Sequence, residues 1–456
     1  MMDKKKLDLF ENSSIPKAAM ALCIPTVLST LVMVLYNIAD TYFVGLLVDP
    51  IESAAVTLAA PVLLAFNAIN NLFGIGASSM MSRSLGKKDY ETVKKCASFS
   101  FYSALVCALV ISLLCTVFIS PLLRLLGADA TTSDATQRYM LWTVTFGAAP
   151  AILNVVLSNM VRSEGSSVHA SIGVMSGCIL NVILDPFFVL PRFLGMGAAG
   201  AGLATLISNC VACLYFFIML FIKRGSTYVS LRPKDFAFRK DIIKEVLGVG
   251  IPASVQNLLN VTGSIILNNF TAVFGADAVS AMGISHKINM IPMYICMGGT
   301  QGIMPLVSYN YSSGNRERMK KAITFIGRLV VAAAAVMTVV IFIFSGDIIR
   351  LFMNDDTVVK YGAPLLRGMS IGIVFLALDF LAVGVFQAIG KGFYSFIFAI
   401  LRKLVLEIPA IIILNKVYPL YGMGYAATCA EVVLAVAAVI MLRKIMKEKP
   451  ASPIAE

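Results

Sequence analysis

Long apolar stretches recur along almost the whole chain, and they limit its fold more than any other feature of the sequence. Each stretch reaches the roughly 20 apolar residues that an α-helix needs to cross the hydrocarbon core of a bilayer. Of the 456 residues, 58% are hydrophobic and only 14% are charged, whereas soluble domains carry roughly 25% charged residues. A transmembrane β-barrel would instead show short segments of alternating polarity. The chain is therefore predicted to be an all-α polytopic membrane protein.

Polar breaks divide the chain into about twelve predicted transmembrane helices, six in each half. The predicted spans of the first half are Lys17–Val48, Ser53–Arg83, Cys96–Leu126, Thr136–Arg162, Val168–Leu190 and Ala199–Lys223. Those of the second half are Ile243–Phe274, Val279–Ser308, Ala322–Phe344, Gly362–Ile389, Tyr394–Asn415 and Gly422–Leu442. Residues 1–223 are predicted to form an N-lobe, residues 224–242 a cytoplasmic linker, and residues 243–456 a C-lobe with a short cytoplasmic tail. The linker is expected to be either a short amphipathic helix on the membrane surface or a solvated segment.

Basic residues gather in every second connection between the predicted spans. They occur at the N-terminus, around Lys87, within 223–244, around Arg318 and in the tail after Leu442. The connections between them are poorer in Lys and Arg. The positive-inside rule then predicts that both termini are cytoplasmic, which agrees with an even number of crossings. The net charge of +12 comes from these basic connections, which orient the chain in the membrane. No nucleic-acid partner is therefore expected.

The two halves of the sequence resemble copies of one unit. Ile24-Pro25 recurs as Ile251-Pro252, and Gly195-Met196-Gly197 recurs as Gly422-Met423-Gly424. Arg124-Leu125-Leu126 likewise recurs as Arg350-Leu351-Phe352. The separation stays near ~225 residues, which is the pattern of a duplicated unit. With six spans each, the copies share one orientation. Parallel repeats of this kind build transporters whose two lobes rock around a central site.

An acid lies inside the predicted span Val168–Leu190. Asp185 follows Asn181 by four residues, so both side chains project from one face of the helix. Burying such a carboxylate in a membrane costs at least ~2.5–3.5 kcal/mol, and intramembrane acids are functional by default. Pro186 comes next and removes a backbone donor, which predicts a hinge. The segment is read as a cation site, or alternatively as a structural Asp capped by neighbouring donors.

Two further spans place polar side chains at a similar depth. Asp40 lies about six residues from the outer end of the first span, with Tyr36 one turn further in. Thr205 is comparably deep in the sixth span. If these groups converge with Asp185, two carboxylates share a low-dielectric pocket able to hold H⁺ or Na⁺. The alternative for Asp40 is an ordinary hydrogen bond between helices.

The second half carries a different set of polar residues. Asp379 is a candidate cation or substrate acid, or else is paired with a neighbour. Glu407 lies close in sequence to Arg402 and Lys403, so an ion pair inside the span is its alternative. Glu431 is expected near the end of its span and carries a weaker signal. The predicted lining of a substrate cavity is Asn154, Gln256, Asn260, Asp379 and Gln387. The amides of the seventh span, among them Gln256 and Asn260, alternatively join helices by hydrogen bonds.

Several function classes lack support in the sequence. No Gly-rich segment ending in Gly-Lys-Ser/Thr is present to bind ATP phosphates. No nucleophile–base pair indicates an enzyme, and the two histidines cannot form a metal centre alone. Nine cysteines fall mostly within apolar spans and predict neither disulfides nor a zinc site. We therefore expect no cofactor and no metal other than a coupling Na⁺.

The chain resembles the multidrug and toxic compound extrusion (MATE) transporters over nearly its whole length. The resemblance rests on Pro25 and Pro252, on Asn37 through Gly45, on the Gly86 loop, on Asn181 through Gly197, and on Gln387-Ala388-Ile389-Gly390. It implies a V-shaped, two-lobed bundle. In the DinF-like branch the coupling acids match Asp40 and Asp185, with Asn181 and Thr205 as co-ligands. The NorM-like branch uses a Glu in the seventh helix, and this chain has an amide near that position, at Asn260. The chain is assigned to the DinF-like side.

The function implied by the resemblance is antiport. We expect export of amphipathic, mostly cationic compounds in exchange for H⁺ or Na⁺, with bending of helices at Pro25 and Pro186. The protein is expected to act as a monomer in the cell membrane, with small-molecule substrates and the lipid bilayer as its partners. The alternative is a flippase for lipid-linked saccharides, which would need basic groups in its cavity. Lys and Arg are scarce within the spans apart from Arg402 and Lys403, which are expected near a span end.

Overall fold

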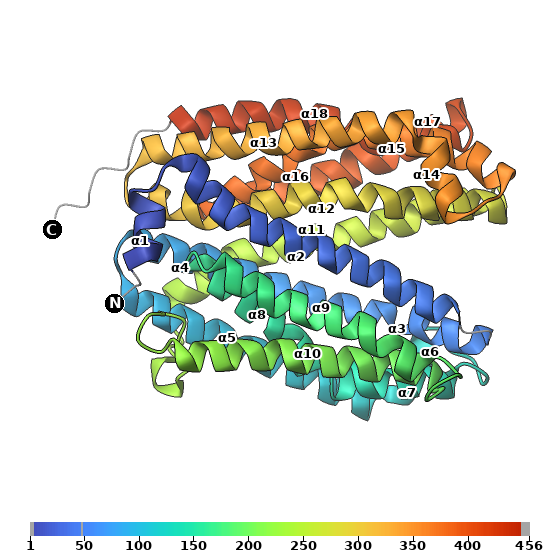
Figure 1. Cartoon of the computed structure of the whole chain (residues 1–456), viewed down its shortest axis with the longest axis horizontal. Helices are drawn as coiled ribbons and strands as arrows, with labels where there is room; N and C mark the ends of the chain where they lie inside the picture. The colour runs from blue at the N-terminus through green and yellow to red at the C-terminus, as the bar shows by residue number, and fades with distance from the viewer. Residues whose placement is uncertain (1–3, 47–48, 448–456) are drawn as a thin grey trace. The chain divides into compact units, whose positions relative to one another are not determined.

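The computed structural model describes residues 4–46 and 49–447, and every regular element in these residues is a helix (Figure 1). The first half contains α1 (Lys4–Glu11), α2 (Ile15–Gly45), α3 (Pro50–Ile69), η1 (Asn70–Ile75), α4 (Gly76–Gly86), α5 (Tyr90–Val117), α6 (Ile119–Leu125), α7 (Ser133–Met140), η2 (Leu141–Thr145), α8 (Ala148–Ser163), α9 (Ser167–Val189) and α10 (Gly197–Ile222). After η3 (Pro233–Asp235) come α11 (Lys240–Ala272), α12 (Ala276–Ser312), α13 (Arg316–Ile343), α14 (Ser345–Phe352), α15 (Asp356–Ala388), α16 (Gly392–Ile400), η4 (Leu401–Glu407), α17 (Ile408–Val417) and α18 (Tyr421–Lys447).

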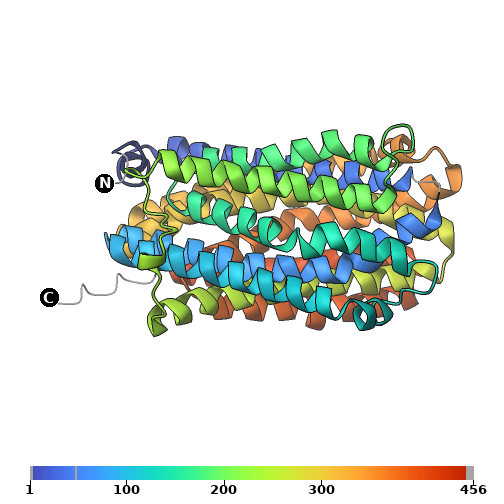
Figure 2. The same cartoon turned by 90° about the horizontal axis from the view of Figure 1, so that it is seen from below.

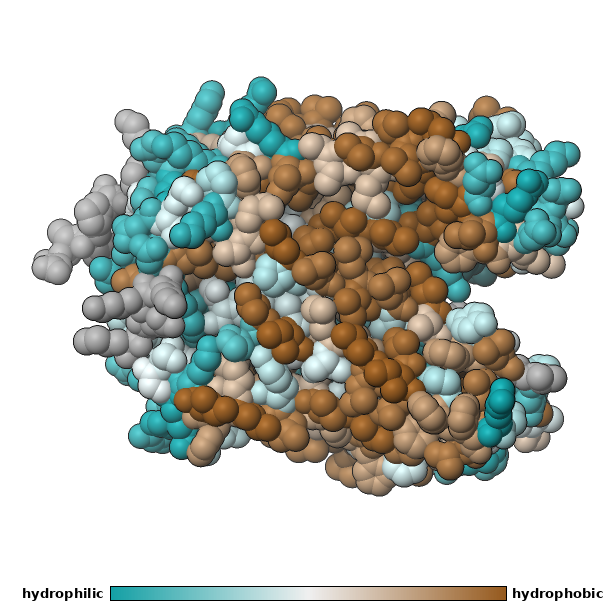
Figure 3. All heavy atoms as spheres, viewed as in Figure 1, coloured by the Kyte–Doolittle hydropathy of each residue, from teal (hydrophilic) through white to brown (hydrophobic). Residues whose placement is uncertain are grey.

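The helices have the length and composition of membrane spans. Within the described residues, ten helical segments are long and apolar enough to cross a bilayer. An eleventh is formed by Ser133–Thr145 and Ala148–Ser163, which meet at a 42° bend. Side chains on the face shown in Figure 3 are hydrophobic along the middle of the helices and hydrophilic at their ends. This distribution matches a hydrocarbon core between two polar surfaces.

The remaining predicted span, Tyr394–Asn415, is also helical, but it is interrupted. It consists of α16 and α17 joined by η4, a π-helical segment. Arg402, Lys403 and Glu407 lie in η4 and lower the hydropathy of the segment. The prediction that Arg402 and Lys403 lie near a span end is therefore wrong, because they lie in its middle. π-Helical segments are frequent at functional sites.

The predicted span Cys96–Leu126 is wrong at both ends. The helix α5 begins at Tyr90, because the Asp89 carboxylate accepts a hydrogen bond from the backbone N–H of Thr92 at 3.0 Å. This is an N-terminal cap that a search for apolar residues does not detect. The helix ends at Val117, and α6 is a separate short helix.

The predicted duplication is visible in the backbone. Left-handed conformations occur at Gly165 (φ 79°) and Gly390 (φ 78°), which occupy matching turns before α9 and α16. Another matching pair is Lys88 (φ 61°) and Gly314 (φ 82°). Each is followed by an N-terminal cap of the next long helix, made by Asp89 in the first half and Asn315 in the second. The same turns are therefore built at the same places in both halves.

The described residues pack as two compact units. One contains the described parts of 1–9 and 31–254, and the other contains 10–30 and the described parts of 255–456. Figure 2 shows the helices of the first unit, from blue to green, running side by side. The first part of α2 belongs to the second unit, where the Thr30 hydroxyl donates to the Tyr294 carbonyl at 3.1 Å. The lobe boundaries predicted at 223 and 243 stay a prediction.

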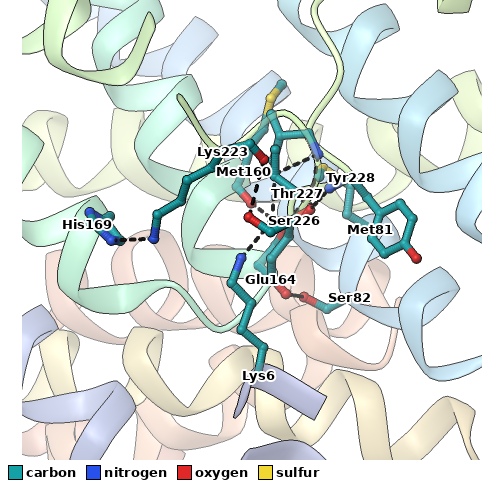
Figure 4. A network of polar contacts seen from close by, with 12 residues as sticks. Lys6, Met81, Ser82, Met160, Glu164, His169, Lys223, Ser226, Thr227 and Tyr228 are labelled. Atoms are coloured by element: carbon teal, nitrogen blue, oxygen red, sulfur yellow. Dashed lines mark hydrogen bonds and ion pairs between the residues drawn. The ribbon is translucent and has the colours of Figure 1, made fainter. Parts of the chain in front are cut away.

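The linker after α10 is neither a helix nor a fully solvated segment. It contains only the short turn η3 and is fixed by Glu164, whose side chain is 2% exposed. The Glu164 carboxylate accepts hydrogen bonds from the Thr227 hydroxyl at 2.8 Å and from the backbone N–H of Val229 at 3.0 Å, and it pairs with Lys6 Nζ at 3.3 Å (Figure 4). A buried carboxylate thus ties the linker to α1 and to the end of α8.

Candidate functional site

The centre of the candidate site is the pair Asn181 and Asp185 on α9. Asp185 is fully buried and Asn181 is 2% exposed. With its amide oriented to satisfy both atoms, Asn181 donates to Asp185 Oδ2 at 2.9 Å. Its other amide atom accepts from the backbone N–H of Thr205 at 3.2 Å and lies 3.3 Å from the Thr205 hydroxyl. The helix α9 runs without a break through Pro186, so the role of this proline as a hinge stays a prediction.

Close packing of α9 against α10 brings Thr205 to this pair. A Cβ atom at Gly173 would lie 2.3 Å from the Phe216 ring, so only glycine permits this approach. The start of α10 is held by Glu52 on α3, whose Oε2 accepts from the backbone N–H of Ala198 at 2.7 Å. The acid at the start of the helix also complements its dipole.

A second acid faces the same place from α2. Asp40 is half-buried and lies close enough to Asp185 for the two charges to interact. Tyr36, one turn earlier on α2, interacts with both carboxylates. Within the described residues neither acid forms an ion pair with Lys or Arg, and Asp185 Oδ1 has no hydrogen-bond partner. The structure therefore brings together the five residues predicted for cation binding, and their role in binding stays a prediction.

Tyr139 belongs to this cluster and was not found by the sequence analysis. It lies at the end of α7, is 6% exposed, and interacts electrostatically with Asp40 and Asp185. No motif surrounds it. The only sequence signal that distinguishes Tyr139 from other aromatic residues in the spans is its charged neighbour, Arg138. The cluster thus presents carboxylate, amide, hydroxyl and phenol oxygens. Such oxygens suit a hard cation, and the carboxylates suit a proton.

A second polar cluster lies within the other unit. Arg402 Nε lies 2.5 Å from Glu431 Oε1, and Arg402 Nη1 lies 3.8 Å from Asp379 Oδ2. Lys403 Nζ lies 2.6 Å from Glu407 Oε1. Asp379 is thus paired with a neighbouring base, which agrees with the second of the two roles expected for it. The expectation that Glu431 lies near a span end is wrong, because it is 2% exposed inside α18.

A small cavity borders this cluster. It has a volume of about 90 Å³, and its polar lining includes Arg402, Lys403, Glu407, Glu431, His286 and Asn289. None of the five residues predicted for the substrate cavity is among its lining residues. Asn154 instead lies in the first unit, where its amide donates to Asn209 at 2.8 Å. Gln256 and Asn260 are half-buried on α11, and Gln387 is buried on α15. A substrate role for these residues stays a prediction.

Comparisons with known proteins identify the family. A family model described as MatE matches the chain twice, at residues 25–187 and 252–413. This chain belongs to the MATE family. The double match also confirms the internal duplication that the sequence predicts.

Related MATE proteins span almost the whole chain. Multidrug export protein MepA of Staphylococcus saprophyticus is 33% identical over 442 residues, which are 97% of this chain and 96% of that protein. The protein of the same name from Staphylococcus aureus strain MRSA252 has the same identity and coverage.

Solved structures share the fold. An outward-facing multidrug resistance MATE family transporter of the MOP superfamily superposes with a TM-score of 0.91 at 26% identity, covering 98% of both chains. A structure described as MATE in the straight conformation gives 0.91 at 26% identity, covering 98% of this chain and 99% of that chain. One described as MATE in the bent conformation gives 0.87 at 27% identity, covering 98% of both.

Proposed function

We propose that this MATE protein is a multidrug antiporter that exports amphipathic, mostly cationic compounds in exchange for H⁺ or Na⁺. The single observation that carries the proposal is the pair of acids, Asp40 and Asp185, which lie together without a basic partner among the described residues. The relatives named multidrug export proteins support the substrate class. We propose that the protein acts as a monomer in the cell membrane. The distribution of Lys and Arg supports a cytoplasmic position for both termini.

The chemistry of the acid pair supports ion coupling. Two carboxylates that share a buried place repel one another, and both lose hydration. A proton shared by the pair, or Na⁺ between their oxygens, relieves both costs. Asn181 holds one oxygen of Asp185 and leaves the other free to bind the ion. The acid pair is therefore more stable with one small cation bound than with none.

Exchange follows if the ion and the substrate favour different conformations of the protein. An ion that binds one state more tightly shifts the population towards that state, and it weakens any ligand that prefers the other. Ion entry at Asp40 and Asp185 then reshapes the first unit and releases the exported compound. Solved MATE structures described as straight and bent support the idea that the family adopts more than one conformation.

The flippase alternative receives less support from the charged residues. A lipid-linked saccharide carries phosphates, so its path needs basic side chains that are free to bind them. Arg402 and Lys403 are buried, but Glu431 and Glu407 already pair with them. In that cluster three carboxylates, with Asp379 as the third, outnumber two bases. An excess of buried acid favours cations over phosphates.

The proposal is tested with the purified protein in lipid vesicles that contain a fluorescent lipophilic cation. We expect an inward gradient of H⁺ or of Na⁺ alone to expel the cation, and the effective gradient names the coupling ion. The control is vesicles without protein. Export that needs neither gradient contradicts the proposal. Movement of a labelled lipid-linked saccharide in place of the cation would support the flippase.

A further inference from the structure

A pocket of about 590 Å³ lies where the linker folds back over the last turns of α10. Its floor is apolar and comes from Phe217, Leu220 and Phe221 on α10. Its lining also contains four basic residues, which are Lys94, Arg224, Arg232 and Lys234. One acid, Asp235, accompanies them, so the bases exceed the acids by three (four minus one). The pocket therefore combines an apolar floor with a strongly positive rim.

The basic groups of the rim are not neutralised. Lys94 Nζ lies 5.8 Å from the centre of the Tyr228 ring, and the Arg224 guanidinium lies 4.6 Å from that of Phe221. No ion pair joins any of the four bases to a carboxylate in the part of the chain that the structure describes. The Asp235 carboxylate instead accepts from the Ser230 hydroxyl at 2.5 Å. The rim thus offers free cationic groups to a ligand.

The linker that completes the pocket is held in place from several sides. The Ser98 hydroxyl donates to the Arg232 carbonyl at 3.0 Å, and the Tyr102 hydroxyl donates to the Leu231 carbonyl at 2.9 Å. The Tyr228 ring stacks on Tyr90 with centroids 4.4 Å apart. Together with the Glu164 contacts in Figure 4, these bonds preform the pocket. A ligand meets an ordered rim instead of a loose loop.

The position of the pocket along the helix indicates its ligand. The floor belongs to the last apolar turns of α10, where Phe221 is 65% and Ile222 is 75% exposed. Lys223 and Arg224 follow directly, which marks the boundary between hydrocarbon and headgroups. We propose that the pocket binds an anionic glycerophospholipid, with its phosphate against the basic rim and its acyl chains against the α10 floor. Free phosphate would leave the apolar floor unused. This inference does not depend on the transport proposal.

Binding is tested by calorimetric titration of the purified full chain in neutral detergent. The ligands are short-chain phosphatidylglycerol, the matching phosphatidylcholine, and glycerol phosphate. The test variant is Lys94→Gln/Arg224→Gln/Lys234→Gln. The matched control, Lys87→Gln/Lys240→Gln/Lys244→Gln, removes the same charge from exposed residues outside the pocket.

We expect phosphatidylglycerol to bind at least about tenfold more tightly than the other two ligands. Phosphatidylcholine has no net charge for the basic groups to attract, and glycerol phosphate has no acyl chains to cover the apolar floor. The test variant should lose about tenfold or more of that affinity, and the control variant less than about threefold. Equal binding of glycerol phosphate or phosphatidylcholine would overturn the proposal, as would equal losses in both variants. If the test variant does not fold, the salt dependence of phosphatidylglycerol binding to the wild-type protein provides the test. Its affinity for phosphatidylglycerol must fall as salt screens the charges, and an unchanged affinity counts against the site.

Discussion

Asn181 and Asp185 lie one turn apart on α9, and the Asn181 amide donates to Asp185 Oδ2 at 2.9 Å. The same amide accepts from the backbone N–H of Thr205 on the neighbouring helix α10. One side chain therefore fixes the orientation of a buried carboxylate and joins two helices. This arrangement leaves Asp185 Oδ1 without a hydrogen-bond partner.

Replacement of Asn181 by Ala should impair export more than folding. The change removes the only side-chain donor to Asp185 Oδ2 among the described residues, and a hydrogen bond to a charged group contributes about 1.5–3 kcal/mol. We expect gradient-driven export of the fluorescent cation to fall about tenfold while the protein still inserts into the membrane. Export at the wild-type rate by Asn181→Ala would show that the amide does not orient the acid.

Tyr139→Phe tests the residue that sequence reasoning missed. The ring stays and only the phenol oxygen near Asp40 and Asp185 is lost. We therefore expect a severalfold rise in the ion concentration that gives half-maximal export, with an unchanged unfolding midpoint. Tyr42→Phe serves as the control, because Tyr42 is 62% exposed. Identical ion dependence in the two variants would remove Tyr139 from the site.

The buried charges of the second unit should behave as one network. Arg402→Gln alone leaves Glu431 and Asp379 buried without their base, which should cost about 3–5 kcal/mol. The double variant Arg402→Gln/Glu431→Gln should lose less than the sum of the two single variants. Unfolding midpoints of the four proteins in detergent provide the test. Additive losses would mean that the two side chains do not interact.

The matching turns of the two halves should respond alike to substitution. Gly165→Ala and Gly390→Ala each force a side chain into a left-handed backbone conformation, which costs roughly 1–2 kcal/mol. We expect similar drops in the unfolding midpoint for both variants. Gly283→Ala is the control, because a Cβ atom there meets nothing within 4 Å and Ala favours the helix. A neutral effect at either turn would contradict equivalent roles for them.

The sequence predicts the spans and the duplication well because bilayer thickness fixes the length of each apolar segment. It also predicts that Asp40, Asp185 and Thr205 lie at a similar level along their helices, since residue position sets that level. The rotation of each helix is not encoded so simply. The pairing of Arg402 with Glu431 on α18 and the approach of Tyr139 depend on how helices pack. Neither contact can be predicted from the spacing of residues in the sequence.

Proline and capping residues show the same limit. Pro186 removes a backbone donor, yet α9 continues to Val189, because a helix in a bundle tolerates the loss of one backbone hydrogen bond. Asp89 starts α5 six residues before the predicted boundary. Local polar contacts of this kind decide where helices end, and hydropathy does not register them.

Export by Asp40→Asn and Asp185→Asn in vesicles with an imposed ion gradient tests the central claim most directly. The control is Asp134→Asn, an acid of the same unit whose side chain is 79% exposed. Ion-driven expulsion of the fluorescent cation should fall to the level of vesicles without protein in both test variants. It should stay near the wild-type level in the control. Full ion-driven export by either test variant would contradict the account.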